Sequence, residues 1–422
     1  MNLLLTFLYA SLYVFAMIKY WKKYRALDSG FFVLSLWTLS AVFSIYFLIV
    51  NNEIKFHDWK DFQIMPFIYL FFTVMIFIYP VLTFKEKYIQ TIWTNDIFAN
   101  MLSFIISIVA IFPFCQNLIQ LIITQSGEYA VLSIMEDRYT DDSYDALYYM
   151  SGFIKSFDFY NNNYFNLVSY GLLFYQLTKP KINRFLVIGL SISIINLLIE
   201  AINIAARFIL VTNILLFLYY YIILKNKIDM RYSQILKKCM IYIGALSVIG
   251  VLTISIIRFT VIDSGMSIFG WIAQYISESH LNFNGYMWDV EKLCYGQNSL
   301  PRYSEMFGFS NDPDRDFRYL STITGIRMNI FYTMVGDLFS DFGAIATFLI
   351  SIGVCVFFKI VCSASPKMRL SQILMLGIIA KTSLLGFTYF TFENYSFQLI
   401  STIIIALILY LGENFKRISY ER

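Results

Sequence analysis

Charged residues are scarce in this sequence. Asp, Glu, Lys and Arg make up 14% of the 422 residues, whereas 58% of the residues are hydrophobic and the mean hydropathy is +0.63. A soluble domain cannot bury this much apolar surface. The net charge of +4 is too small to argue for a nucleic-acid partner, no basic patch with interleaved aromatic residues occurs, and we expect no nucleic acid. The composition therefore indicates an integral membrane protein.

The sequence also has few residues or motifs that could bind a metal, form disulfide bonds or bind a nucleotide. The two histidines, His57 and His280, are far apart in the sequence and form no pair at ligand spacing. The run "NDPDRDFR" begins like a calcium loop but lacks the glycine and the final glutamate of one. Four of the five cysteines lie in or beside apolar runs, so no disulfide framework is expected. No glycine-rich phosphate loop and no internal repeat occurs, and we expect no metal and no cofactor.

Long apolar runs are abundant. A membrane core of about 30 Å requires roughly 20 residues of helix. The windows that satisfy this length lie at about 1–18, 30–50, 63–84, 97–123, 162–178, 185–202, 207–224, 239–258, 340–361, 371–391 and 395–412. We therefore expect an all-α, polytopic membrane protein with about 11 transmembrane helices.

The positions of Lys and Arg predict the orientation of these helices. Twenty of the 32 basic residues fall in six connections that alternate along the chain, at 19–25, 85–87, 179–184, 225–238, 359–369 and 416–422. The positive-inside rule assigns these connections to the cytoplasm. The N-terminus is then outside and the C-terminus is cytoplasmic.

Two long polar segments, at about 125–161 and 259–337, fall on the opposite face. Both are acidic, and the second contains enough aromatic residues to fold. Connections longer than about 15 residues are uncommon unless they are functional or disordered. We therefore divide the chain into helices 1–8 with a shorter outer loop (1–258), a large, partly helical outer loop (259–337) and helices 9–11 (338–422).

Several charges lie close to the outer membrane surface. The turn in "EAINIAARFILVTN" is short, so Glu200 and Arg207 must both lie near this surface, and Arg258 ends the eighth predicted helix. Each has an ordinary interpretation as a helix-end charge. Lys381 lies near the middle of the tenth helix, where a charge costs at least roughly 2.5–3.5 kcal/mol and must face protein or water. Together such cations could bind an anionic phosphate group.

The stretch "NIFYTMVGDLFSDFG" (329–343) precedes the ninth apolar window. If it is helical from Asn329, then Asn329, Thr333, Asp337 and Asp341 form one polar stripe that enters the membrane from outside. Helix capping is the alternative explanation for one of the aspartates. Of the two, we expect Asp341 to be the more structural and Asp337 the more exposed to substrate.

The pattern N-x-x-x-T-x-x-G-D-x-x-x-D-F-G after a long outer loop resembles the bacterial O-antigen and capsule repeat-unit polymerases of the Wzy type. Two more features are similar to that family: the short outer turn with Arg207 in "AARFILVTN", and the segment "YISESHLNFN" (275–284) after Arg258. The resemblance covers mainly residues 200–350. The hydroxyl residue that the family often has before the turn arginine is absent here, since the sequence reads "NIAAR".

The resemblance implies a metal-independent glycosyltransferase of the GT-C type in the bacterial inner membrane. Such an enzyme transfers a growing glycan from undecaprenyl diphosphate to the non-reducing end of an incoming lipid-linked unit. It implies as partners the undecaprenyl-diphosphate-linked oligosaccharide, membrane lipid and a chain-length regulator. The catalytic residues implied are Arg207 and Arg258 for the diphosphate, and His280 or Glu278 for the acceptor hydroxyl. The substrate-binding residues implied are Arg327, Lys381, Asp337, Asp341, Tyr275, Asn329 and Thr333.

Two other functions stay open at this point. An O-antigen ligase has the same architecture and donor but transfers the glycan to lipid A-core. A flippase or transporter would more often show internal repeats and interrupted helices. The Asp-Phe-Gly motif favours the polymerase over the ligase.

Overall fold

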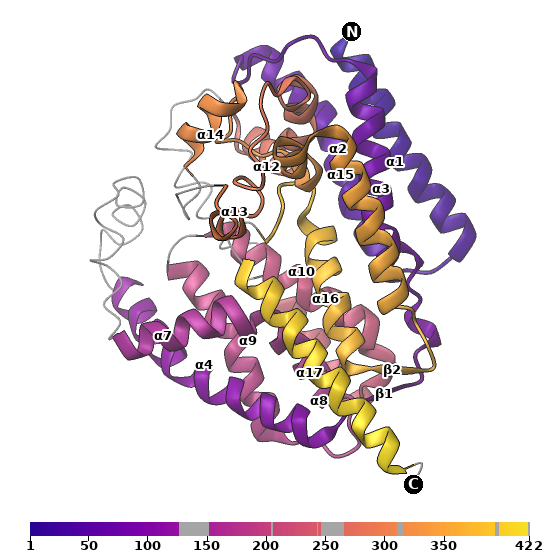
Figure 1. Cartoon of the computed structure of the whole chain (residues 1–422), viewed down its shortest axis with the longest axis vertical. Helices are drawn as coiled ribbons and strands as arrows, with labels where there is room; N and C mark the ends of the chain where they lie inside the picture. The colour runs from indigo at the N-terminus through magenta and orange to yellow at the C-terminus, as the bar shows by residue number, and fades with distance from the viewer. Residues whose placement is uncertain are drawn as a thin grey trace. The chain divides into compact units, whose positions relative to one another are not determined.

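The computed structural model describes residues 1–125, 152–203, 206–242, 244–245, 266–309, 316–392 and 396–420. The chain folds into two compact units (Figure 1). Unit 1 comprises residues 1–86, 263–363 and 379–396, and unit 2 comprises residues 87–262, 364–378 and 397–422. The described part of the predicted outer segment 259–337 therefore folds with the first three long helices, in unit 1.

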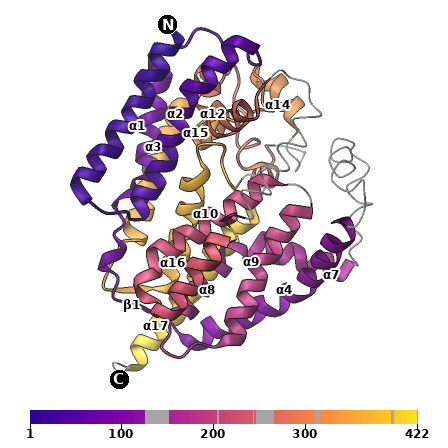
Figure 2. The ribbon, with the colours of Figure 1, turned by 180° about the vertical axis from the view of Figure 1, so that it is seen from behind.

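Unit 1 is helical. Its elements are α1 (Asn2–Tyr24), α2 (Ser29–Ile54), α3 (Ile64–Thr83), α12 (Ile268–Gly285), η4 (Met287–Asp289), α13 (Pro301–Met306), α14 (Phe317–Thr324) and α15 (Thr333–Val361). Three of the helices have a side-chain N-cap. Asp28, Ser267 and Asp316 accept hydrogen bonds from backbone N–H groups of α2, α12 and α14, respectively. Helix α2 packs against both α1 and α12, and α15 packs against α3 (Figure 2).

Unit 2 contains β1 (Thr91–Trp93), α4 (Asp96–Gln125), α7 (Gly152–Tyr160), the π-helical turn η2 (Asn161–Phe165), α8 (Asn166–Leu177), α9 (Arg184–Asn203), α10 (Arg207–Leu224), η3 (Lys225–Lys227), β2 (Lys367–Arg369) and most of α17 (Ser396–Tyr420). The turn η1 (Glu86–Tyr88) and α16 (Leu370–Leu385) contribute residues to both units. Residues 230–242 are also helical. Helix α9 packs against α4, α8 and α10, and β1 pairs in parallel with β2. No pattern in the sequence predicted this short strand pair.

Eight helices in the described part of the chain are long and apolar enough to cross a membrane. They are α1, α2, α3, α4, α9, α10, α15 and α17, and each coincides with a window expected from the sequence. The other three windows coincide with α8, which has 12 residues, with α16, which has 16, and with a segment described as far as residue 245. The chain is a multi-pass membrane protein, and the count of about 11 stays a prediction.

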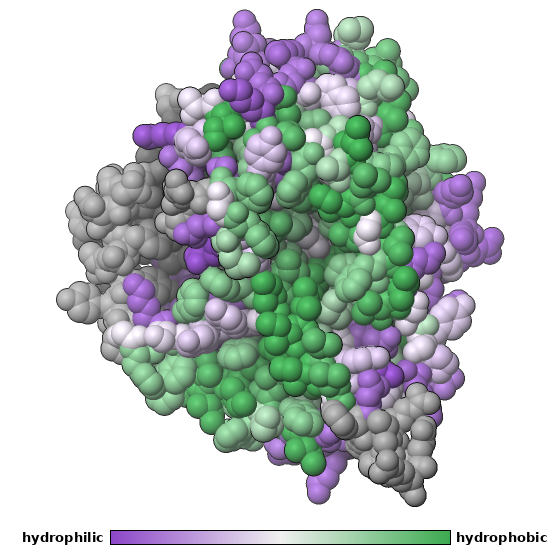
Figure 3. Space-filling view, in the orientation of Figure 1, coloured by the Kyte–Doolittle hydropathy of each residue, from purple (hydrophilic) through white to green (hydrophobic). Residues whose placement is uncertain are grey.

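The long helices expose apolar side chains. On α15, Ile345, Leu349 and Ile360 are each more than half exposed, and on α17 Ile404, Leu407 and Ile408 are as well. Figure 3 shows apolar surface over both helices. Exposed faces of this kind are stable in contact with lipid tails.

Candidate functional site

The residues predicted to form the site belong to different units. Arg207 lies in unit 2, whereas the other described members of the predicted set, from Tyr275 to Lys381, lie in unit 1. Arg258 lies outside the described residues. Arg207 is the first residue of α10, as the sequence predicted, and the description of this residue is limited to its backbone.

Asp341 is a structural anchor in unit 1. It is completely buried, and its carboxylate accepts hydrogen bonds from Asn298 N–H (3.0 Å), Ser299 N–H (2.6 Å) and the Ser299 hydroxyl (2.5 Å). Its carbonyl oxygen also accepts a bond from Tyr295 N–H (3.1 Å). Charge-assisted bonds to a carboxylate are about twice as strong as neutral ones. Asp341 therefore holds the turn at 295–299 against α15.

Asp337 is buried as well, with 2% of its surface exposed. One carboxylate oxygen accepts a bond from Phe390 N–H (2.7 Å), and the other accepts a bond from the Asn298 amide (3.2 Å). The expectation that Asp337 faces the substrate is wrong, because protein groups surround its carboxylate. Asp337 joins the turn at 295–299 to the segment that follows α16.

The expected polar stripe is also wrong at its first residue. Helix α15 begins at Thr333, so Asn329 lies outside the helix, where it is exposed and accepts a bond from Arg327 Nε (3.0 Å). The Thr333 hydroxyl accepts Gly336 N–H (3.2 Å) inside the first turn. Neither aspartate caps α15, since both lie at least one turn inside it. The helix breaks at Gly343, whose φ of 75° is a left-handed conformation that glycine readily adopts.

His280 is a core residue. It is completely buried, with one ring nitrogen 2.8 Å from the Tyr9 hydroxyl on α1 and the other 2.8 Å from the Ser40 hydroxyl on α2. Burial lowers the pKa of His280 to about 3, so the ring is neutral at physiological pH. Both nitrogens are occupied, and the geometry does not support the predicted role as a base. His280 ties α12 to α1 and α2.

Glu278 forms a buried contact with His57 that the sequence did not reveal. Its Oε2 lies 3.1 Å from His57 Nε2 and accepts a bond from the Gln274 amide (2.8 Å). His57 stacks on Trp59, with ring centroids 4.9 Å apart. The Asn51 amide donates to the His57 carbonyl and accepts a hydrogen bond from the His57 N–H. Glu278 is 3% exposed, so the pair joins α12 to the segment after α2. No sequence signal links residues 221 positions apart, which is why this pair was missed.

Tyr275 and Lys381 contact aromatic rings of the same unit. Tyr275 is partly exposed, and its ring centroid lies 5.9 Å from that of Phe331. Lys381 is 4% exposed, and its Nζ lies 5.0 Å from the centre of the Phe392 ring. Lys381, which was expected to face protein or water, is enclosed by protein, and the Phe392 ring contributes a cation–π contact.

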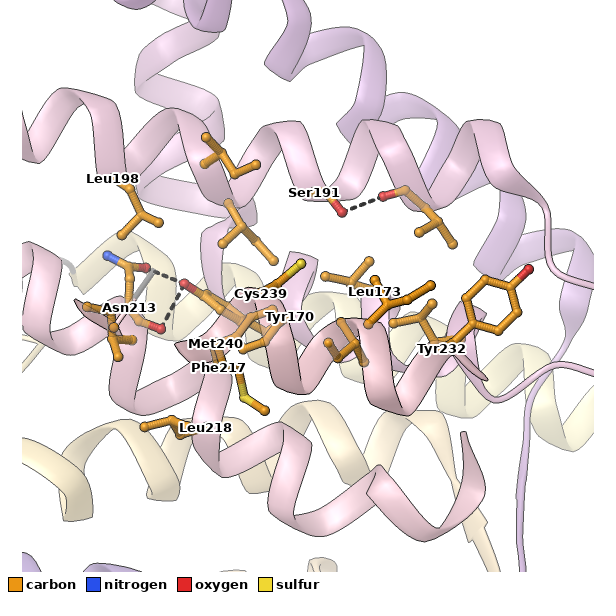
Figure 4. Close-up of a pocket in the computed structure, with 18 residues that line it drawn as sticks. Tyr170, Leu173, Ser191, Leu198, Asn213, Phe217, Leu218, Tyr232, Cys239 and Met240 are labelled. Carbon is orange, nitrogen blue, oxygen red and sulfur yellow. Dashed lines mark hydrogen bonds between the residues drawn. The ribbon is translucent and has the colours of Figure 1, made fainter. Parts of the chain in front are cut away.

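Unit 2 contains an apolar cavity of about 410 Å³ among α8, α9, α10 and residues 232–244 (Figure 4). Its walls are mainly aliphatic and aromatic side chains such as Leu173, Leu198 and Phe217. Asn213 and Tyr170 lie at one end and Tyr232 at the other, as Figure 4 shows. Asn213 Oδ1 accepts a bond from the Tyr170 hydroxyl (2.6 Å). The volume is in the range of ligand-binding pockets, which is roughly 300–1,000 Å³.

A buried polar network begins at the Asn213 end of this cavity. The Asn166 amide donates to Asn213 Oδ1 (3.4 Å), and Asn166 Oδ1 accepts a weak bond of the same length from the Gln398 amide. The Gln398 amide also donates to the carbonyl of Asn162 (3.1 Å), in η2. π-Helical turns occur frequently at functional sites. The turn places consecutive asparagines in the interior of the unit.

Two carboxylates belong to the same network. Asp158 Oδ1 accepts bonds from the amides of Asn196 (2.9 Å) and Asn117 (3.4 Å), and Glu200 Oε2 accepts a bond from the Asn162 amide (2.5 Å). Burial raises the pKa of Asp158. The asparagine-rich run "YNNNYFN" (160–166) was the one sequence signal that could have revealed the network.

Together the cavity and the network are suited to an amphiphile. The apolar walls suit a hydrocarbon chain, and Asn213, which the buried network holds, gives one end of the cavity its polar group. Among the described residues, no group of three or more His, Cys, Asp or Glu side chains could hold a metal ion. Comparisons with protein-family models, with curated proteins and with solved structures found no match to this chain.

Proposed function

We propose that this protein is a membrane glycosyltransferase that polymerises lipid-linked oligosaccharide repeat units. It transfers the growing glycan from undecaprenyl diphosphate to the non-reducing end of the next lipid-linked unit, at the outer face of the bacterial inner membrane. The donor is activated by its own diphosphate, so the chemistry requires no nucleotide-binding motif. The motif at 329–343 and the short turn before Arg207 support this assignment.

The observation that carries the proposal is the position of Arg207 relative to the cavity of unit 2. Arg207 begins α10, and Asn213 at the polar end of the cavity lies six residues further along the same helix. At 1.5 Å per residue, about 9 Å of helix separates the two backbone positions. A lipid diphosphate with its tail in the cavity and its head near the start of α10 matches this arrangement.

Arg207 then binds the diphosphate and stabilises the charge that develops on the leaving group. A guanidinium suits this role because its planar fork binds two phosphate oxygens at once. In the proposed site Arg258 assists it. Of the substrate-binding residues that the resemblance implies in unit 1, Arg327 and Asn329 are exposed. Asp337, Asp341 and His280 support the fold of unit 1, since protein groups occupy their polar atoms, and Glu278 contributes through the contacts of its Oε2 with His57 and Gln274.

Replacement of Arg207 tests the proposal. Arg207→Ala removes charge-assisted bonds worth roughly 1.5–3 kcal/mol each. It should therefore lower polymerisation at least about tenfold at an unchanged level of membrane protein, as measured by the glycan ladder on a gel. Arg207→Lys should also be poor, because a point charge does not reproduce the fork. Arg231→Ala is the matched control, since Arg231 is an exposed arginine on another helical segment.

The result separates this function from its rivals. Full-length ladders in both Arg207 variants would refute a phosphate-binding role for Arg207. If the wild type instead lengthened no glycan but moved finished glycan to lipid A-core, the protein would be a ligase. Accumulation of lipid-linked units on the cytoplasmic side in the variants would indicate a flippase.

A further inference from the structure

The two carboxylates of the unit 2 network differ in how they are held. Asp158 accepts hydrogen bonds from three amides, those of Asn117, Asn162 and Asn196. Among the described residues, the Asn162 amide is the one hydrogen-bond partner that Glu200 has. Asp158 is therefore fixed as an acceptor inside the network, whereas Glu200 retains a carboxylate oxygen for another group.

Both carboxylates are largely enclosed by protein. Asp158 is 8% exposed, whereas Glu200 lies in the intermediate range of exposure. The single Asn162 side chain bonds to both carboxylates, so it sets the position of Glu200 against a rigid neighbour. A base needs this combination of a fixed position and an oxygen that can accept a proton.

A buried acceptor lies one turn beyond Glu200 on α9. Asn203 is 6% exposed, and its amide donates to the carbonyl of Asn117 (3.0 Å). Its Oδ1 has no hydrogen-bond partner among the described residues. A buried acceptor without a donor costs roughly 1–3 kcal/mol. A ligand that carries hydroxyl groups would satisfy it.

Glu200 and Arg207 lie at the same end of adjacent helices. Glu200 is in the last turn of α9, and Arg207 is the first residue of α10, which packs against α9. The N–H of Ala206 donates to the carbonyl of Ala201 (2.7 Å), so the end of α9 and the start of α10 lie close together. A diphosphate at the start of α10 therefore places its bond to the sugar near the end of α9.

We propose that Glu200 is the catalytic base that deprotonates the acceptor hydroxyl, an inference that rests on the proposed polymerase function. The acceptor oxygen forms a bond to the anomeric carbon of the donor as its proton moves to the Glu200 carboxylate. The bond from the anomeric carbon to the phosphate oxygen breaks, and its electron pair leaves with the lipid diphosphate. The products are the elongated glycan, a lipid diphosphate anion and a protonated Glu200, which returns its proton to water.

The experiment uses the full-length protein reconstituted in lipid nanodiscs, with lipid-linked repeat units extracted from the source cells as substrate. Polymer formation is measured from pH 5 to 9 for the wild type, Glu200→Gln and Glu200→Asp. Glu413→Gln is the matched control, since Glu413 is a buried carboxylate of unit 2 whose partner is Ser371. Binding of undecaprenyl diphosphate is measured in parallel by native mass spectrometry.

We expect Glu200→Gln to lower the rate by about 10²–10⁴-fold, the usual contribution of a general base, and to retain undecaprenyl diphosphate. The wild-type rate should fall toward acid pH, and the residual rate of Glu200→Gln should not show this fall. Glu200→Asp should recover part of the wild-type rate. A structural role would lower lipid binding and protein yield together and leave the pH profile unchanged, which would overturn the assignment.

The result also separates this inference from the proposed function. If Glu200→Gln polymerises at the wild-type rate and Arg207→Ala does not, the polymerase proposal stands and the base assignment is wrong. If wild-type protein neither binds undecaprenyl diphosphate nor extends the glycan, the proposed function itself is wrong.

Discussion

Replacement of Asp341 by Asn tests whether the aspartates of the 329–343 motif anchor the fold. The Asp341 carboxylate uses both oxygens to accept bonds from Asn298 N–H, Ser299 N–H and the Ser299 hydroxyl. An asparagine offers one acceptor oxygen and turns its NH₂ group toward N–H donors. At least one charge-assisted bond is then lost and one buried N–H is unpaired, a cost of about 3–6 kcal/mol. This is a large part of the roughly 5–15 kcal/mol that stabilises a typical protein.

Thermal unfolding of the purified protein in detergent measures the effect. At about 2–4 °C per kcal/mol for a unit of this size, Asp341→Asn should melt at least about 6 °C below the wild type, and less of it should accumulate in membranes. Asp337→Asn should have a smaller effect, since the bonds that its carboxylate accepts from Phe390 N–H and from the Asn298 amide include only one backbone donor.

Asp316→Asn is the matched control, because Asp316 caps α14 at an exposed position and Asn caps a helix as well as Asp does. An Asp341→Asn protein that melts with the wild type but makes no glycan would refute the structural role and return Asp341 to the list of substrate-binding residues.

Three further predictions concern pH, the cavity and topology. Burial lowers the pKa of His280 to about 3 from its ordinary value near 6.5. Between pH 3 and pH 6.5, His280 therefore binds a proton in the unfolded chain but not in the folded chain. Stability should therefore fall by about 1.4 kcal/mol for each pH unit below 6.5, and melting curves of His280→Gln should show a weaker loss between pH 7 and 5. Phe217→Trp should fill the cavity and weaken retention of undecaprenyl diphosphate about tenfold, or about 1.4 kcal/mol, in native mass spectrometry, whereas Phe112→Trp at an exposed site on α4 should not. Reporter tags after residue 230 and at the C-terminus should report cytoplasm and a tag near residue 300 the outside, and a cytoplasmic signal at 300 would contradict the proposed orientation.

The sequence by itself determined the class of the protein and the positions of its long helices. Apolar windows such as 30–50 and 185–202 coincide with α2 and α9 because bilayer thickness sets the length of a crossing helix and local apolar composition marks where it lies. The start of α10 at Arg207 was expected from the short turn before it, and Lys381 was expected to face protein or water. A charge inside a hydrophobic run must face protein or water whatever the fold.

Tertiary structure decided which polar side chains meet. Asp337 and Asp341 have the spacing of a substrate-binding stripe, but the turn at 295–299 and Phe390 N–H occupy their oxygens. The partner of Glu278 is His57, which no periodicity connects to it. The asparagine and carboxylate network of unit 2 gathers side chains from α4, α7, η2 and α9. Hydrogen bonds act over about 3 Å of space, and a sequence specifies that distance only through the packing of its helices.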